Sequence, residues 1–291
     1  MNIKHFFDQD TFTLTYIVSD NNSKDCVIID PVLDYDQASG LVEDRSLKEV
    51  IDFIKQEGLK VQAILETHAH ADHLTGSQIL KQQFPHAAVG IGARIKTVQE
   101  LFKNHFNLDF IQTDGSQFNL LFKDGEEINF GTLKMKALPT PGHTPACMSY
   151  LFGDAVFTGD ALFMPDYGTG RCDFPKGSSK DLYQSVTKQL YVLPDSTRVF
   201  VGHDYGPNGR EIQFQTTIGE SKKNNIQLKA STSEDEFVSF REARDRTLKA
   251  PRLLLPSIQI NIDAGHLPPK ESNGKSYLKI PLTLKLDKGT L

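Results

Sequence analysis

The sequence contains few cysteines and no long apolar run. Cys26, Cys147 and Cys172 are odd in number and widely spaced, so they predict neither a disulfide framework nor a Cys-x-x-Cys zinc site. No apolar segment approaches the length of a membrane span. The N-terminus lacks the apolar core of a secretory signal. These absences predict a cytoplasmic protein that does not associate with a membrane.

An excess of positive charge is also missing. The chain has 32 lysines and arginines against 37 aspartates and glutamates, which gives a net charge of -5. Nucleic-acid-binding proteins normally present a basic face, so we expect no nucleic-acid partner. An acidic substrate would have to be bound by local cations, because the overall charge does not attract it. With 291 residues, the chain is long enough for one large domain or two modest ones.

Short apolar strands alternate with amphipathic helices over the first 210 residues. Expected strands cover residues 12–18, 26–29, 61–65, 88–91, 128–130, 133–137, 148–152, 155–158 and 198–201. Expected helices cover residues 46–58, 75–83, 95–102 and 180–190. The spacing of Ser46 and Glu49 predicts a capping box at the start of the first helix.

The composition changes after residue 210. One polar helix is expected from residue 211 to about Asn225, and a second from Ser233, with capping-box spacing to Glu236, through Thr247. Residues 251–291 are rich in proline and polar turns, which favours irregular structure. We therefore expect a main domain of residues 1–210. A helical and irregular extension, residues 211–291, would pack on it at the mouth of the site.

Seven residues of metal-ligand type follow predicted strands. Four lie in the segment Thr67-His68-Ala69-His70-Ala71-Asp72-His73, and three more each follow a glycine. Loops that follow strands are held in place by the scaffold, which suits ligand residues. Imidazole binds zinc, iron and similar metals, and a carboxylate adds negative charge. The sequence thus predicts a metal-dependent enzyme with ligands drawn from His68, His70, Asp72, His73, His143, Asp160 and His203.

Simpler interpretations of these residues were weighed against catalysis. An isolated histidine is usually a surface or hydrogen-bonded residue, and we assign His5, His86 and His105 to that class. A purely structural zinc site is usually closed and rich in cysteine, whereas this set offers only nitrogen and oxygen ligands. The clustering of the seven residues therefore favours a catalytic metal.

The order of the seven residues along the chain resembles the ligand pattern of the metallo-β-lactamase superfamily, and the resemblance covers about residues 10 to 210. The resemblance implies an α/β fold, the αββα four-layer sandwich, with two sheets face to face, helices outside and a metal site at one edge. One fold hosts many reactions, so the fold alone does not identify the chemistry.

Finer motifs are similar to those of the persulfide dioxygenases, also called sulfur dioxygenases. They are THAHADHLTGS at residues 67–77, FTGDALF at 157–163, GRCDF at 170–174 and GHDY at 202–205. The tail, residues 255–269, resembles bacterial members of this branch named β-lactamase-hydrolase-like proteins. Glyoxalase II is a close cousin, but its glutathione-contacting segment is not found here.

The resemblance implies one Fe(II) per chain, bound by His68, His143 and Asp160. Such a face of two histidines and one carboxylate leaves positions for water, substrate sulfur and O₂. The other four ligand-type residues would orient the ligands and tune the iron: His70, Asp72, His73 and His203. The implied reaction oxidises glutathione persulfide with O₂ and water to sulfite and glutathione. Relatives of this branch also imply a homodimer.

Two residues are candidates for substrate binding. Glutathione carries two carboxylates, and Arg171 lies in the glycine-arginine pair of the family. Tyr205, beside His203, could donate a hydrogen bond to the substrate and join the catalytic set. The alternative for Arg171 is a structural ion pair with Asp160, Asp166 or Asp173, and the two interpretations are evenly balanced.

This sequence departs from animal relatives in two places. They have threonine at the position of Cys172, and their loop corresponding to residues 164–169 is shorter. A small pocket-lining residue is the favoured interpretation of Cys172 over a redox relay, because reactivity requires a lowered pKa. Lys176 and Arg210 are expected to be solvated surface charges.

Two other functions stay open. A dinuclear thioester hydrolase of the glyoxalase II type would use all seven ligands for two zinc or iron ions, bridged by Asp160, and a metal-bound hydroxide would attack a carbonyl. A non-catalytic metal-binding sensor is the other alternative. The complete ligand set argues against the sensor, because a sensor does not need all seven residues.

Overall fold

Two six-stranded sheets form the centre of the molecule in the computed structural model, which describes residues 1–283. The first sheet has the order β1(Asn2–Asp8), β2(Thr13–Ser19), β3(Asp25–Ile29), β6(Lys60–Leu65), β8(Ala88–Gly92) and β9(Leu120–Phe122). The second has the order β10(Glu127–Phe130), β11(Leu133–Pro139), β12(Met148–Phe152), β13(Ala155–Phe157), β14(Arg198–Phe200) and β15(Gln215–Thr217). A small sheet contains β5(Leu41–Glu43), β4(Val32–Asp36) and β7(Leu74–Thr75).

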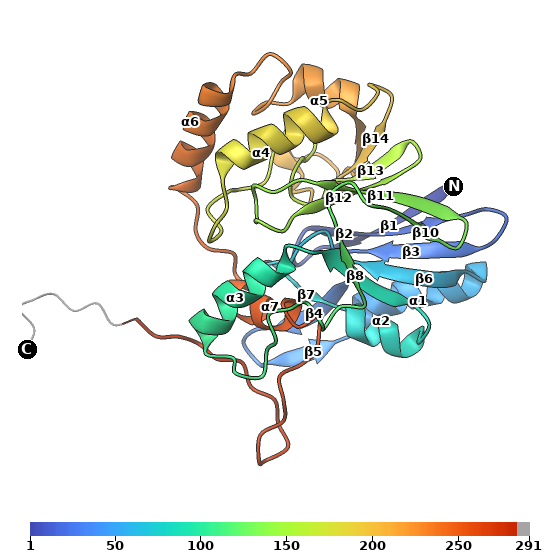
Figure 1. Ribbon diagram of the computed structural model, residues 1–291, viewed down its shortest axis with the longest axis vertical. Helices are drawn as coiled ribbons and strands as arrows, with labels where there is room; N and C mark the ends of the chain where they lie inside the picture. The colour runs from blue at the N-terminus through green and yellow to red at the C-terminus, as the bar shows by residue number, and fades with distance from the viewer. Residues whose placement is uncertain (284–291) are drawn as a thin grey trace, which may run out of the picture.

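Helices cover the outer faces of both sheets (Figure 1). The first sheet is covered by α1(Arg45–Glu57), α2(Ser77–Gln83), α3(Ile95–Phe106) and α7(Leu254–Asn261). The second is covered by α4(Ser179–Ser185), which continues as a π-helical turn at Val186–Leu190, and by α5(Ile218–Asn224) and α6(Glu234–Asp245). A 3₁₀ turn lies at Pro207–Gly209. The layers confirm the predicted αββα sandwich.

The strand β2 shows how the two sheets build the core. Its residues Leu14, Tyr16 and Val18 belong to the cluster between the sheets, whereas Ile17 packs under the helices. Because both faces of this strand are covered, all seven of its residues are buried. The second sheet contributes Met135 to the same inner cluster.

One of the two predicted capping boxes is present. At α6, the Ser233 side chain accepts from Glu236 N–H while the Glu236 carboxylate accepts from Ser233 N–H, as predicted. The prediction at Ser46 is wrong, because α1 begins at Arg45. Asp34 accepts hydrogen bonds from both the backbone N–H and the hydroxyl of Ser46, at 2.9 and 3.0 Å, and so occupies the serine.

The region after residue 210 differs from the prediction in two places. The helix expected from residue 211 begins only at Ile218, because residues 215–217 pair with β14 as β15. The tail is not irregular throughout, since residues 254–261 form α7 and bury Ile258 and Ile260 against the first sheet. The division of the chain at residue 210 stays a prediction.

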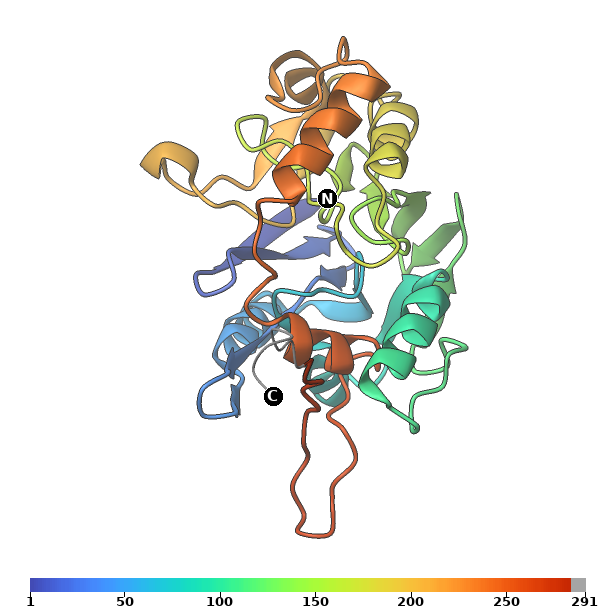
Figure 2. The same cartoon turned by 90° about the vertical axis from the view of Figure 1, so that its left-hand side faces the viewer.

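The remaining tail extends from the body as a long arm, which Figure 2 shows below α7. Leu267 and Tyr277 on this arm are about half exposed. Within residues 1–283, none of the helices has both the length and the apolar composition that a bilayer span requires.

Candidate metal centre

The fold brings all seven predicted ligand residues to one edge of the two sheets. His68, His70, Asp72 and His73 lie in the loop after β6, and the other three follow β11, β13 and β14: His143, Asp160 and His203. All are buried except Asp72, which is half-buried. Two sets of three have ligand atoms within 4.8 Å of one another: His68, His143 and Asp160 form one, and His70, Asp72 and His203 form the other.

In the first set, hydrogen bonds fix the orientation of both histidines. His143 Nδ1 donates to the carbonyl of Arg171 at 2.7 Å, which leaves Nε2 as the acceptor nitrogen, 3.4 Å from Asp160 Oδ2. The Thr67 hydroxyl donates to Asp30 Oδ2 at 2.7 Å, so at 3.0 Å from His68 Nδ1 it acts as the acceptor. Both rings therefore turn Nε2 toward the site, and this is the nitrogen that each would offer to a metal.

Two buried atoms of this set have no hydrogen-bond partner among the described residues: His68 Nε2 and Asp160 Oδ1. Burial, followed by the neighbouring His70 and His143, holds the pKa of His68 well below its ordinary value, so its ring is neutral. Buried lone pairs without a partner are costly, and a cation between them would remove that cost. Two imidazoles and one carboxylate fit a divalent transition metal.

In the second set the carboxylate has close partners within the protein, although both ring nitrogens of His70 form no hydrogen bond among the described residues. Asp72 Oδ2 lies 3.1 Å from His73 Nδ1, 3.4 Å from His203 Nε2 and 3.2 Å from the Thr13 hydroxyl. Although burial opposes ionisation, His203 and His73 hold the pKa of Asp72 well below its ordinary value. His203 Nδ1 donates to the Phe12 carbonyl at 3.1 Å, so its Nε2 faces Asp72 and Asp160.

His70 has two further carboxylate neighbours that the sequence analysis missed. Its Nε2 lies 2.9 Å from Asp30 Oδ1 and 3.5 Å from Glu66 Oε2. These contacts raise the pKa of His70 well above its ordinary value, against the opposing effect of burial. Glu66 also accepts hydrogen bonds from the Thr75 and Ser77 hydroxyls. The only sequence signal was position, since Asp30 ends a strand and Glu66 precedes the histidine motif.

Asn261, the last residue of α7, was also missed. Its side-chain N–H groups donate to the carbonyls of His70 and His73, at 2.8 Å each, and its carbonyl accepts from the N–H of Thr75 at 2.9 Å. The ligand loop is thus held from the C-terminal part of the chain. A polar residue at the end of a helix that buries Ile258 and Ile260 was the available signal.

Glycine is required beside Asp160. Gly159 has φ +48, and a Cβ added there would lie 2.5 Å from Thr67 Oγ1. That hydroxyl joins His68 to Asp30. A side chain at position 159, next to the ligand residue Asp160, would therefore disturb the contact that orients His68. The glycine before the ligand residue therefore has a steric reason.

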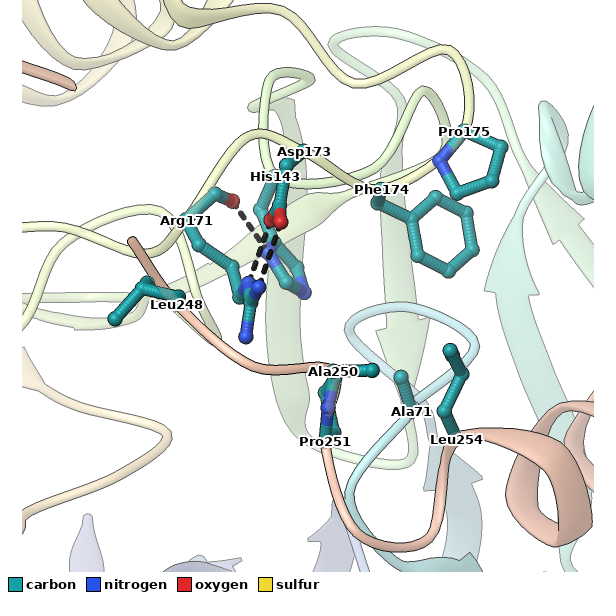
Figure 3. Close-up of a pocket in the computed structure, with 10 residues that line it drawn as sticks. All are labelled: Ala71, His143, Arg171, Asp173, Phe174, Pro175, Leu248, Ala250, Pro251 and Leu254. Carbon is teal, nitrogen blue, oxygen red and sulfur yellow. Dashed lines mark hydrogen bonds and ion pairs between the residues drawn. The ribbon is translucent and has the colours of Figure 1, made fainter. Parts of the chain in front are cut away.

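Three adjoining cavities open around the first set, and Arg171 lines all of them. One, of about 150 Å³, is mostly apolar and includes His143, Phe174 and Leu254 (Figure 3). The second, of about 250 Å³, includes Asp160 and Tyr205. The third, of about 190 Å³, shares Asp160, Arg171 and Tyr205 with the second. Pro251 lines the first two, so the tail lies at the mouth of the site, as expected.

In the structure, Arg171 forms a structural ion pair, which was the alternative to substrate binding. Its Nε and Nη2 donate to the two oxygens of Asp173 at 2.5 and 2.6 Å, and Nη1 donates to the carbonyl of Lys249 at 2.7 Å (Figure 3 shows the pair with Asp173). The guanidinium charge is thus compensated before any substrate arrives. Direct binding of a substrate carboxylate by Arg171 stays a prediction.

Tyr205 lies beside the site with 39% of its surface exposed. Its ring stacks on His203 at a centroid distance of 5.8 Å and contacts Tyr167 at 4.7 Å. Among the described residues its hydroxyl has no hydrogen-bond partner, so it is available to a ligand. The predicted surface role of Arg210 is wrong, because its guanidinium pairs with both Asp166 and Asp204.

Cys172 is a core residue and lines none of the three cavities. Its backbone N–H donates to Asp245 at 2.8 Å, and burial raises the pKa of its thiol. A thiol that stays protonated is a poor nucleophile. The expectation that Cys172 lines the pocket is therefore wrong, and its environment does not suit a redox relay.

Comparison with known proteins places this arrangement among enzymes. Residues 9–203 match the protein family described as the metallo-beta-lactamase superfamily. Glyoxylase B2 of Dictyostelium discoideum is 49% identical over 282 residues, which cover 96% of each chain. A beta-lactamase hydrolase-like protein of Agrobacterium fabrum is 46% identical over 96% of this chain, which spans only 64% of that protein.

Two further similarities concern persulfide dioxygenases and a solved relative. The human mitochondrial persulfide dioxygenase ETHE1 is 31% identical over 82% of this chain and 79% of its own. The crystal structure of ETHE1 from Myxococcus xanthus superposes with a TM-score of 0.74 and 32% identity, over 91% of this chain and all of the other. These similarities agree with the family and the branch expected from the motifs.

Proposed function

Because this chain belongs to the metallo-beta-lactamase superfamily, we propose for it a function found within that family. The function is that of an iron-dependent persulfide dioxygenase with one Fe(II) per chain. Its substrates would be glutathione persulfide, O₂ and water. Its products would be glutathione, sulfite and two protons, which balances the atoms and the electrons of the reaction.

The observation that carries the proposal is the contrast between the two ligand sets. His68 Nε2 and Asp160 Oδ1 are buried without partners, and His143 Nε2 faces them. Asp72, in contrast, already pairs with His73 and His203. One cation on the first set would give His68 Nε2 and Asp160 Oδ1 a partner. Ring nitrogens of His70 and His73 also lack hydrogen bonds, but a cation there would compete with the carboxylate contacts of His70 and with those of Asp72. This favours a single metal on a face of two histidines and one carboxylate.

Iron bound by this face would supply open coordination positions and redox chemistry for the persulfide sulfur and O₂. The protein groups around it have positioning roles. The Arg171 carbonyl orients His143, and Thr67 orients His68 through its hydroxyl. The Tyr205 hydroxyl, at the wall of the cavity that contains Asp160, would donate a hydrogen bond to the substrate.

Similarity supports the reaction class. The human protein named persulfide dioxygenase is 31% identical over 82% of this chain. The Myxococcus xanthus protein of the same family name has a TM-score of 0.74. The more similar Dictyostelium relative has a different name, so these similarities support the branch more than the substrate.

Oxygen uptake by the iron-loaded protein tests the proposal. Glutathione persulfide should cause O₂ consumption with one sulfite formed per O₂, and metal analysis should give one iron per chain. Metal-free protein reloaded with zinc serves as the control, and it should consume no O₂. The absence of uptake, together with hydrolysis of S-lactoylglutathione, would overturn the proposal.

A thioester hydrolase is the second candidate. The set His70, Asp72 and His203 has ligand atoms within 4.8 Å of one another, and Asp160 Oδ1 lies 3.3 Å from His203. These distances would allow a second metal with Asp160 as the bridge. The name of the Dictyostelium relative, glyoxylase, points the same way. Two metals per chain would support this candidate and contradict the dioxygenase.

A further inference from the structure

Two arginines beside the site lack the carboxylate partner that Arg171 has. Arg244, in the last turn of α6, lines the cavity of about 190 Å³, and Arg252 lines the cavity of about 250 Å³. Both residues are exposed, and within residues 1–283 neither guanidinium forms an ion pair. Arg241, in contrast, is buried and paired with Asp245. Arg244 and Arg252 thus offer the cations that a dianionic substrate requires.

The two cavities diverge from a shared wall. Both are lined by Asp160, Arg171 and Tyr205, but only one contains Arg244 and only the other contains Arg252. Glutathione has the matching pattern, because its sulfur is on the central residue and a carboxylate is at each end. A sulfur placed at the shared wall, beside Asp160, would direct the two carboxylates into different cavities.

The charges of the two cavities also differ. The cavity of Arg252 contains the exposed carboxylate of Asp10 in addition to the acids of the metal set. Arg252 is also near enough to Asp36 to contribute, after nearer hydrogen bonds, to the lowered pKa of that carboxyl. In the cavity of Arg244, Asp160 is the only carboxylate among the lining residues. One cavity thus offers an exposed arginine with an exposed acid, and the other offers an exposed arginine without one, beside the already paired Arg171 and Arg241.

We propose that this asymmetry sets the orientation of the thiol carrier. The γ-glutamyl end, which has both an α-carboxylate and an α-ammonium group, binds Arg252 and Asp10. The glycine end, which has only a carboxylate, binds Arg244. The inference rests on glutathione as the carrier in the proposed function, and it assigns the carboxylates to residues other than Arg171.

Calorimetric binding of S-methylglutathione to the iron-loaded protein under anaerobic conditions tests the orientation. This ligand keeps all charges of glutathione but has no reactive sulfur. Three analogues each lack one charge: the glycine ethyl ester, the 4-aminobutyryl analogue without the α-carboxylate, and the glutaryl analogue without the ammonium. Each should bind the unmodified protein about tenfold more weakly, the typical effect of one charged hydrogen bond.

Variants then assign each charge to its residue. Arg244→Met should weaken the binding of S-methylglutathione about tenfold. This variant should bind S-methylglutathione and its glycine ethyl ester with equal affinity. Arg252→Met should bind S-methylglutathione and the 4-aminobutyryl analogue with equal affinity. Asp10→Asn should bind S-methylglutathione and the glutaryl analogue with equal affinity. Arg246→Met is the matched control, because Arg246 is exposed just after α6 and lines none of the described cavities. It should bind every ligand as the unmodified protein does.

The outcomes separate this inference from the proposed function. If Arg244→Met still discriminates against the ethyl ester, or if the two arginines exchange their preferences, the orientation is wrong. Charge-specific losses at both arginines without any O₂ uptake would support the orientation and reject the dioxygenase. O₂ uptake with glutathione persulfide that is unchanged in both arginine variants would support the dioxygenase and reject the orientation.

Discussion

The two halves of the site contain similar residues but differ in their internal contacts. In one half, His68 Nε2 and Asp160 Oδ1 are buried without hydrogen-bond partners, and His143 offers a ligand atom near both. In the other half, Asp72 lies against His73 and His203. A cation would complete the first half, whereas in the second half the carboxylate is already compensated and only ring nitrogens of His70 and His73 lack hydrogen bonds.

This difference shows why residue type alone does not define a metal ligand. Metal binding to a histidine must displace any proton on the nitrogen that binds the metal. His68 is neutral, since its pKa is well below the ordinary value. His70 lies against Asp30, and its pKa is well above the ordinary value. A metal therefore meets less competition from protons at His68 than at His70.

The largest expected effect is that of removing a ligand from the first half. His143→Ala should lose iron and lower kcat/KM by at least about a thousandfold, because one of three metal-binding atoms is gone. Metal analysis and O₂ uptake measure the two effects. His86→Ala, at an exposed position, is the control and should behave as the unmodified protein. Retained iron with full turnover would contradict the ligand role.

Asn261→Ala tests the support beneath the second half. The change removes three buried hydrogen bonds and leaves the carbonyls of His70 and His73 without partners. We expect a loss of about 3 kcal/mol in the free energy of unfolding, measured in urea on metal-free protein. Asn273→Ala, at an exposed position, is the control. Equal midpoints for the two variants would show that the contacts of Asn261 contribute nothing.

Asp72→Asn compares the two halves directly. The variant should keep one iron per chain but lose about 10- to 100-fold in activity, the usual effect of changing a residue that orients ligands. The change removes the charge that faces His73 and His203. Metal content and O₂ uptake are measured together. Two metals per chain in the unmodified protein and one in Asp72→Asn would show that the second half also binds a metal, and the two halves would then not differ in this respect.

The smallest effect is expected at Cys172. Its buried thiol has a raised pKa and lines none of the described cavities. Cys172→Ser should therefore keep its iron and change kcat/KM by less than about threefold, since no thiolate takes part. A hundredfold loss with iron retained would mean that the sulfur participates in the reaction.

The sandwich was predicted through the resemblance to the family, and the meeting of the seven residues was predicted from local patterns. Apolar strands followed by glycine and a ligand residue mark the edge of a sheet, and the chain order of these residues is specific for the family. The supporting residues were not predictable in this way. Asn261 lies 191 positions from His70, and only the packing of α7 brings them together.

Local competition explains the missing capping box and the ion pair that Arg171 forms. Ser46 and Glu49 have the spacing of a capping box, but Asp34 takes the serine from a neighbouring strand. Arg171 has a carboxylate only two residues away, so Asp173 compensates its charge. In the first case a partner outside the motif decided the outcome, and in the second a residue of the same GRCDF segment did.

The hydrogen bonds of Asn261 also bear on the order in which the site is assembled during synthesis. His73 is translated 188 residues before Asn261, which at about 5–20 residues per second corresponds to a delay of about 10–40 s. Throughout this interval the nascent ligand loop lacks the partner for its carbonyls, although His68 and its neighbours have already left the ribosome. The full set of contacts around the ligand loop can therefore form only after α7 has been synthesised.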